Sequence, residues 1–178
     1  TFFLYCCKER VYKITMFNYN KDFFSGVYEK SDWIVSETFN RCIKFNNIKH
    51  FKEELIKTVN KSKENLKLSL LTSHPELTGK IEVKNLTKDS LSEQKSAGLN
   101  QCSIEEFEKL HTMNNSYNKK FNFPFIIAVS GLNVAEIIKN FEIRIENTYG
   151  FELNEAIRQV HKIASIRIDQ KIKLLERK

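Results

Sequence analysis

Of the four histidines in the chain, His74 has the surroundings best suited to acid–base chemistry. It follows an apolar segment at residues 64–72 and stands directly before Pro75, where a helix has to end. Carbonyl groups at a helix C-terminus favour positive charge, so we expect this position to raise the pKa of the imidazole. A fixed histidine with a pKa near neutrality suits a general acid or base, although a His-Pro pair is also ordinary helix punctuation. The other histidines lie beside charged residues in helical patterns, where solvated or core-rim positions are usual: His50, His111 and His161.

A polar cluster follows at residues 90–94, Ser-Leu-Ser-Glu-Gln. Ser90 and Glu93 have the spacing of a capping box, in which each side chain satisfies the other residue's backbone donor. The same carboxylate, with the amide of Gln94 beside it, could instead face a substrate. The sequence leaves both interpretations open.

Arg167 stands among apolar neighbours in the last helical pattern of the chain. A guanidinium in such company needs a partner, because burying an unpaired charge is costly. An internal ion pair or a side chain that reaches the surface is one interpretation. The other is a clamp for a substrate carboxylate or a polarised carbonyl.

Helical patterns dominate the elements that have to position these residues. Ser31 can cap a helix that carries Trp33, and residues 48–62 place apolar side chains at helical spacing. Residues 64–72 are leucine-rich and should be largely buried. Further helices are expected at residues 90–97, from Ser103 with a capping box, from Asn133 to about 145 with a break at Gly150, and from about 152 to the C-terminus. The sequence predicts one all-α, compact multi-helix domain.

One segment departs from the helical pattern. Residues 121–129 are apolar almost throughout and contain Pro124, which pushes the preceding residue out of helical geometry. The preceding helix should therefore end before this proline. Residues 125–129 are then either a buried extended strip or a short helix.

Charge and composition limit the other possibilities. The chain has 178 residues, a net charge of +7 and four cysteines, none of them in a Cys-x-x-Cys pair, so neither a zinc site nor a disulfide framework is indicated. The basic balance raises a nucleic-acid-binding helical module as a rival. The charges alternate in sign along the helical patterns, which is typical of a solvated face, so we expect no nucleic acid as a partner. No apolar stretch is long enough to span a membrane.

Five motifs, in order, resemble one known family. Residues 24–33, Phe-Ser-Gly-Val-Tyr-Glu-Lys-Ser-Asp-Trp, resemble its Gly-Gly-Val-Phe-Glu-His-Ser-Pro-Trp. Residues 74–80, His-Pro-Glu-Leu-Thr-Gly-Lys, resemble its His-Pro-Asp-Leu-Ala-Gly-Lys, and residues 90–99 resemble its Ser-x-x-Glu-Gln-x-x-Ala-Gly-Leu. Residues 118–126 resemble its Lys-Phe-Gly-Phe-Pro-Phe-Ile segment, and residues 162–167 its Ile-Ala-x-x-Arg. The family is that of 2-oxo-4-hydroxy-4-carboxy-5-ureidoimidazoline (OHCU) decarboxylases.

The resemblance covers residues 17–175 and departs from the family pattern at Glu76, usually Asp, and Asn122, usually Gly. It implies an all-α fold, a homodimer, a small-molecule substrate, no cofactor and no metal. The implied reaction is decarboxylation of OHCU to (S)-allantoin in urate breakdown. An alternative is a protein of the same fold that acts on or binds a related ureido or hydantoin compound.

The resemblance also implies the site residues. His74 and Glu93 would be catalytic. The substrate would be held by residues on four segments: Pro75, Ser90, Gln94, Phe125, Ile126, Ile127, Ala128, Val129 and Arg167.

Residues 1–15 differ from the rest of the chain. They begin with a short apolar run that no basic residue precedes, so they do not resemble a secretory signal. Met16 follows directly. We expect residues 1–15 to be a leader or an extension ahead of the natural start, residues 16–178 to form the OHCU-decarboxylase-like domain, and the protein to be cytoplasmic.

Overall fold

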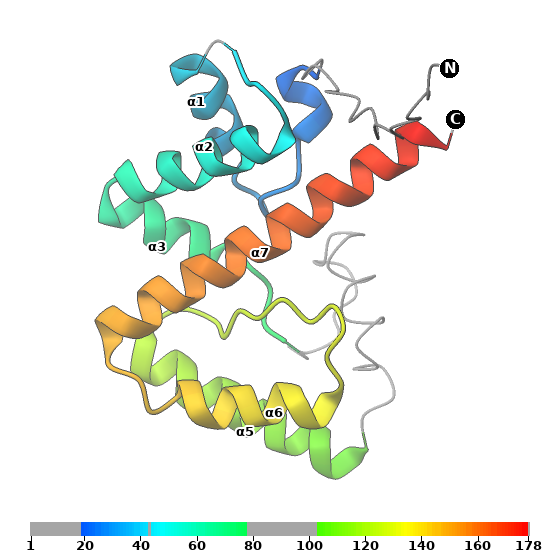
Figure 1. The fold of residues 1–178 in the computed structure, drawn as a ribbon. Coiled ribbons are helices and arrows are strands. Elements are labelled where there is room, and N and C mark those ends of the chain that lie inside the picture. The colour runs from blue at the N-terminus through cyan, green and yellow to red at the C-terminus, as the bar shows by residue number, and fades with distance from the viewer. Residues whose placement is uncertain (1–18, 43, 78–102, 178) are drawn as a thin grey trace, which may run out of the picture.

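The computed structural model of the chain describes residues 19–42, 44–77 and 103–177, and in these ranges it consists of helices and their connections, with no strand. The elements are a short 3₁₀ helix and six α-helices (Figure 1): η1 Lys21–Phe24, α1 Trp33–Arg41, α2 Ile48–Lys61, α3 Glu64–Thr72, α5 Ile104–Phe121, α6 Val134–Arg144 and α7 Tyr149–Glu176. The prediction of an all-α domain is confirmed. The helix expected at residues 90–97 lies outside the described residues, as does the segment 1–15.

Capping boxes fix where two of the helices begin. At α5, the Ser103 hydroxyl accepts from the Glu106 backbone N–H at 3.1 Å, and the Glu106 carboxylate accepts from the Ser103 N–H at 3.0 Å. Asn133 and Glu136 form the same reciprocal pair at α6. Each box satisfies backbone donors that a helix start otherwise leaves unpaired. Both starts are where the sequence predicts them.

Two expected helix boundaries are wrong. Asp32, not Ser31, is the residue before α1, and its side chain makes no capping bond there, because the carboxylate binds the preceding loop instead. Gly150 does not lie in a break between helices. It is the second residue of α7, which begins three residues earlier than the sequence suggests. A glycine at the first turn of a helix costs little, since few backbone hydrogen bonds depend on it.

Helix α7 connects the two halves of the molecule. In Figure 1 it runs diagonally, in orange and red, with α1, α2 and α3 on one side and α5 and α6 on the other. Apolar side chains from both halves form one core together with those of α7: Ala156, Ile157, Val160, Ala164 and Ile168. Neither α7 nor any other helix of the described residues is long and apolar enough to cross a membrane.

Helix α3 is buried at one end only. Leu70 and Leu71 are fully buried, whereas Leu66 is 38% exposed, so the expectation that residues 64–72 are largely buried holds for the C-terminal half of the helix. The buried end is the one that leads into His74.

The segment after Pro124 is a buried strip without helical structure. Helix α5 ends at Phe121, and the next residue, Asn122, has a left-handed backbone (φ 59°), a conformation that asparagine tolerates better than most residues. From Pro124 to Val129 the chain forms neither helix nor turn, and residues 125–129 are all buried. Of the two expected conformations, the non-helical one is therefore the one found.

Candidate active site

His74 lies just beyond the buried end of α3. Its backbone N–H donates to the Leu71 carbonyl at 3.1 Å, and its Nδ1 lies 2.9 Å from the Leu70 carbonyl oxygen. A carbonyl can only accept, so Nδ1 carries the proton of this bond. In the neutral ring, Nε2 then holds the lone pair. The residue is 9% exposed, and it has the orientation and tautomer of a fixed base.

The environment of His74 shifts its pKa in the direction opposite to the one expected. Burial lowers the pKa to about 4, and this effect outweighs the hydrogen bond to the Leu70 carbonyl and the charge of Glu29, which both raise it. The charge of Arg167 lowers it further. The expectation of a raised pKa considered the helix end alone, without the cost of burying an imidazolium. His74 is consequently neutral at pH 7.

Arg167 comes from α7 and forms a buried ion pair. Its Nη1 lies 3.0 Å from Oε2 of Glu29 and 3.4 Å from the Gly26 carbonyl oxygen. The two side chains are only 3% and 1% exposed. Of the interpretations left open for Arg167, the internal ion pair is present. It lies close enough to His74 for both of its charges to shift the pKa of the imidazole.

Glu29 is the site neighbour that sequence reasoning missed. It lies within the motif at residues 24–33, where the family pattern also has a glutamate, but no role was assigned to it. A buried carboxylate that pairs with an arginine 138 residues away cannot be recognised from local spacing. The available signal was the need of Arg167 for an acidic partner.

The segment that follows His74 is anchored on α5. Asn114 donates to the Leu77 carbonyl, and Asn118 donates to the Glu76 carboxylate. Pro75, between them and His74, is partly exposed. These bonds hold the segment that follows His74 in place on α5.

The backbone of the strip after Pro124 has groups pointing in two directions. The Ile126 carbonyl accepts from Arg144 Nη1 at 2.7 Å, and the Ala128 N–H donates to Gln159 Oε1 at 3.0 Å. Adjacent residues of an extended chain direct their backbone groups to opposite sides. The N–H and C=O of Ile127 have no hydrogen-bond partner in the described part of the chain, although the residue is only 6% exposed. Buried backbone groups are normally paired, so this donor–acceptor pair is suited to a ligand.

Three predicted site residues lie outside the described residues: Ser90, Glu93 and Gln94. The structure brings His74 and Arg167 together and ties the 125–129 strip to α7. The roles of all these residues remain predictions.

The remaining histidines divide into two kinds. His111 is exposed and His50 is partly exposed, as expected of solvated residues. His161 is different, because its Nδ1 lies 2.8 Å from the Tyr28 hydroxyl and burial lowers its pKa to about 4. It is a core-rim histidine that links the loop before α1 to α7.

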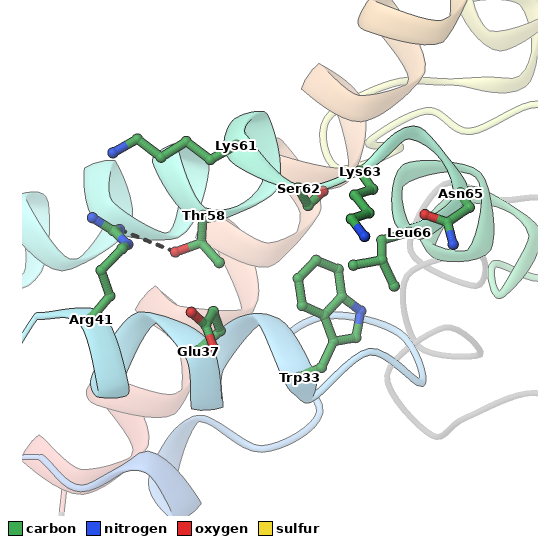
Figure 2. Close-up of a pocket in the computed structure, with 9 residues that line it drawn as sticks. All are labelled: Trp33, Glu37, Arg41, Thr58, Lys61, Ser62, Lys63, Asn65 and Leu66. Atoms are coloured by element: carbon green, nitrogen blue, oxygen red, sulfur yellow. Dashed lines mark hydrogen bonds between the residues drawn. The ribbon is translucent and has the colours of Figure 1, made fainter.

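A separate cavity of about 560 Å³ lies between α1, α2 and the start of α3. Figure 2 shows Trp33, Glu37 and Leu66 around it, with Arg41 bonded to Thr58. Arg41 is also paired with Glu54 at 2.7 Å. None of the predicted site residues lines this cavity, which lies at the opposite end of α3 from His74. Among the described residues, no group of three or more His, Cys, Asp or Glu side chains could hold a metal ion.

Comparison with known proteins agrees with these features. The profile of the OHCU decarboxylase family matches residues 18–169. A 2-oxo-4-hydroxy-4-carboxy-5-ureidoimidazoline decarboxylase from Halalkalicoccus jeotgali is 33% identical over 84% of this chain and 82% of its own. A uric acid degradation bifunctional protein from a Bacillus species is 30% identical over 82% of this chain and 28% of its own. A crystal structure of (S)-allantoin synthase superposes with a TM-score of 0.68 at 26% identity, covering 85% of this chain and 49% of that one. The chain belongs to the OHCU decarboxylase family.

Proposed function

We infer that this protein decarboxylates OHCU to (S)-allantoin, the reaction after which its relatives are named. The observation that carries the inference is the state of His74 in a chain of this family: it is buried, neutral, fixed on the Leu70 carbonyl, and next to Arg167. A fixed neutral imidazole of this kind can accept a proton and return it.

The substrate itself supplies much of what the reaction needs. When the bond between the ring carbon and the carboxylate breaks, carbon dioxide leaves and the electron pair moves into the adjacent ring, which can accept it. A proton is then added to one face of the ring. The protein has to orient the substrate, stabilise the charge that develops and control where the proton goes.

The described residues suggest a division of these tasks. Nε2 of His74 would handle the proton beside the departing carboxylate. Arg167 would polarise a carbonyl oxygen, and the backbone of Ile127 would pair with a urea-like edge of the substrate, which offers the same N–H and C=O groups. Pro75 and the rest of the 125–129 strip would form the walls. Ser90, Glu93 and Gln94 would complete the site, with Glu93 aligning either His74 or the ureido N–H groups.

The first experiment is a coupled assay. OHCU is generated in place from urate with urate oxidase and hydroxyisourate hydrolase, and formation of (S)-allantoin is followed by circular dichroism. We expect a fast signal with the wild-type protein and a loss of about 10²–10⁴-fold with His74→Asn. His111→Asn is the matched control, because His111 is exposed and should leave the rate unchanged. Slow, racemic product at the rate of the enzyme-free control would overturn the proposal and favour a related ureido or hydantoin compound as the ligand.

Glu93→Gln distinguishes the two interpretations of residues 90–94. Loss of most of the turnover number with unchanged stability indicates a catalytic carboxylate. Loss of stability with unchanged turnover number indicates a capping box.

We further propose that the protein is a cytoplasmic homodimer. Large apolar side chains stand exposed on the described surface, among them Ile143 and Phe151, which are 60% and 64% exposed. A contiguous apolar surface marks an interaction site, and the proposal is that such side chains meet across the dimer. Light scattering coupled to gel filtration should give twice the mass of the chain, and a monomer at micromolar concentration would contradict the assembly.

A further inference from the structure

The peptide group between Ile127 and Ala128 is held by a side chain of α7. The Ala128 N–H donates to Oε1 of Gln159 at 3.0 Å. Both residues are buried, with 2% of Ala128 and 7% of Gln159 exposed. In Figure 1 this segment belongs to the yellow-green connection between α5 and α6. The bond therefore ties the connection directly to the helix that carries Gln159.

The orientation of the Gln159 amide is fixed by Glu155, one helical turn earlier. Nε2 of Gln159 donates to Oε1 of Glu155 at 2.8 Å, and two nitrogens of Arg158 bind the same carboxylate at 2.7 and 2.6 Å. Burial raises the pKa of this carboxyl group, but the hydrogen bonds from Arg158 and Gln159 outweigh burial and lower it, so the group is ionised at pH 7. An ionised carboxylate only accepts hydrogen bonds. Nε2 therefore has to face Glu155, and Oε1 faces Ala128.

The same bond sets the direction of the Ile127 carbonyl. A trans peptide group is planar, and its C=O and N–H point in opposite directions. No cis peptide bond occurs in the described part of the chain. Because the Ala128 N–H points at Gln159, the Ile127 C=O points away from Gln159. The Ile127 N–H likewise points away from Arg144, which binds the Ile126 carbonyl of the preceding peptide group.

The two peptide groups on either side of Ile127 differ in what else holds them. The first lies close to Phe125, whose ring stacks on that of Phe141 with the ring centres 3.8 Å apart. This packing fixes the start of the strip independently of any one hydrogen bond. The second group is followed by small side chains that make no ring contact. Its plane consequently depends more strongly on the bond to Gln159.

We propose that Gln159 is a positioning residue for the ligand, which holds the peptide group at 127–128 so that the Ile127 carbonyl accepts from an N–H of a ureido group. The proposal rests on the function inferred above, in which this strip meets the urea-like edge of the substrate. A ureido group offers N–H groups beside a C=O, and Ile127 offers the complementary acceptor and donor. If the peptide plane could rotate, ligand binding would include the cost of ordering it.

Gln159→Leu tests this, because it removes the acceptor for Ala128 and keeps a side chain of similar size. We expect the Kd of (S)-allantoin, measured by calorimetry, to rise about tenfold, the usual effect of one neutral hydrogen bond. KM for OHCU should rise by a similar factor, while the turnover number stays within about threefold of the wild type. A contact to the ureido edge is made equally before and during the reaction, so its loss weakens binding without slowing the chemical step.

Isotope labelling observes the peptide group directly. The sequence has an Ile-Ala pair at two places, 127–128 and 163–164. With isoleucine labelled at its carbonyl carbon and alanine at its nitrogen, an amide–carbonyl correlation spectrum contains one signal from each pair. (S)-Allantoin should move the carbonyl signal of Ile127 and leave that of Ile163, inside α7, in place. In Gln159→Leu, the amide proton of Ala128 should shift upfield, because it loses its acceptor.

The matched control is Thr58→Val, which removes another buried side-chain hydrogen bond. The Thr58 hydroxyl accepts from Arg41 at 3.1 Å and lies 2.7 Å from the Thr38 hydroxyl. Helix α2, which carries it, is on the opposite side of α7 from the connection between α5 and α6 (Figure 1). Both variants should lose stability, but only Gln159→Leu should lose affinity for (S)-allantoin. If the two variants bind it equally well, Gln159 has only a structural role and the proposal is wrong.

A second variant covers the case in which Gln159→Leu does not fold. Gln159→Asn keeps the amide on a side chain one carbon shorter, which no longer reaches Ala128. It should show the same loss of affinity, and an affinity equal to that of the wild type would contradict the positioning role.

The binding measurements do not depend on turnover, so they separate this proposal from the function on which it rests. Turnover of OHCU with an unmoved Ile127 signal at saturating (S)-allantoin would overturn the role of Gln159 and leave the decarboxylase function intact. A moved Ile127 signal without turnover of OHCU would support the role of Gln159 for a related ureido or hydantoin compound.

Discussion

Two buried arginine–glutamate pairs each have one member on α7, and they differ in the groups around them. At Arg144–Glu152, the carboxylate accepts from both Nε and Nη2 of Arg144, from the Tyr117 hydroxyl and from Asn147. The remaining amino group of Arg144 binds the Ile126 carbonyl, and the guanidinium lies 4.5 Å from the centre of the Phe125 ring. All three nitrogens of the Arg144 guanidinium and both oxygens of the Glu152 carboxylate bind other groups of the protein, which is the pattern of a structural network.

The pair Arg167–Glu29 has a titratable neighbour instead. The charges of both members shift the pKa of His74. The carboxylate of this pair comes from the loop before α1, which Asp32 holds in place. Two pairs of equal chemistry can therefore serve different purposes, and the groups around them, more than their own geometry, indicate which purpose.

Breaking the structural pair should have the largest effect on stability. Glu152→Gln leaves Arg144 buried without a compensating charge, which typically costs about 3–5 kcal/mol of the free energy of unfolding. Urea denaturation followed by the fluorescence of Trp33, the one tryptophan of the sequence, measures it. The turnover number of the folded fraction should stay within about twofold of the wild type. A tenfold loss of turnover in folded protein would place Glu152 in the catalytic machinery.

Exchanging each arginine for lysine separates the two pairs by rate. Lysine keeps the charge but loses the planar set of donors. We expect Arg167→Lys to lower kcat/KM about 10²-fold, the usual cost of removing an oriented donor that meets developing charge. Arg144→Lys should lower the unfolding midpoint and leave kcat/KM within about threefold. Equal rates for the two variants would contradict the distinction.

Stability should also depend on pH through His74 and His161. Burial lowers the pKa of His74 and His161 to about 4, below the value of about 6.5 of an unfolded histidine. The unfolded chain then binds more protons between these values, so this stability is complete above pH 6.5 and is lost as the pH falls towards 4. Each group contributes at most about 1.4 kcal/mol per pH unit. The free energy of unfolding is measured with urea between pH 7.5 and 5. It should change less with pH in His74→Asn than in His111→Asn, and an equal pH dependence would argue against a buried neutral His74.

The smallest effect is expected from a helix cap on the structural side. Asn133→Ala removes the side-chain acceptor at the start of α6, the helix that ends at Arg144. It should cost about 1 kcal/mol of the free energy of unfolding and leave the rate unchanged. Thermal unfolding with a parallel activity assay tests both, and a changed rate would show that the network around Arg144 reaches the site.

Features that depend on neighbouring residues could be predicted from the sequence. The capping box at Ser103, the helix cap at Asn133 and the interruption at Pro124 follow from spacings of three residues or fewer, and all three are confirmed. Membership of the family is confirmed as well, because it rests on motifs spread over the whole chain.

Features that depend on burial could not be predicted. The direction of the His74 pKa shift, the exposure of Leu66 and the position of Asp32 before α1 are decided by what packs against each residue. The partner of Arg167 was missed for the same reason, because Glu29 reaches it only through the tertiary fold. The structure identifies the partner and leaves the roles of the site residues to experiment.

The position of α7 between the two halves determines how the molecule unfolds. Its 28 residues span about 42 Å, and it shares the core with helices of both halves. Neither half can lose its packing without exposing one side of this helix. Amide hydrogen exchange in the middle of α7 should therefore proceed only through global unfolding, with the protection of the Ala156 and Ala164 amides matching the full free energy of unfolding. Arg167 is carried on the same helix, so its position persists for as long as the whole fold does.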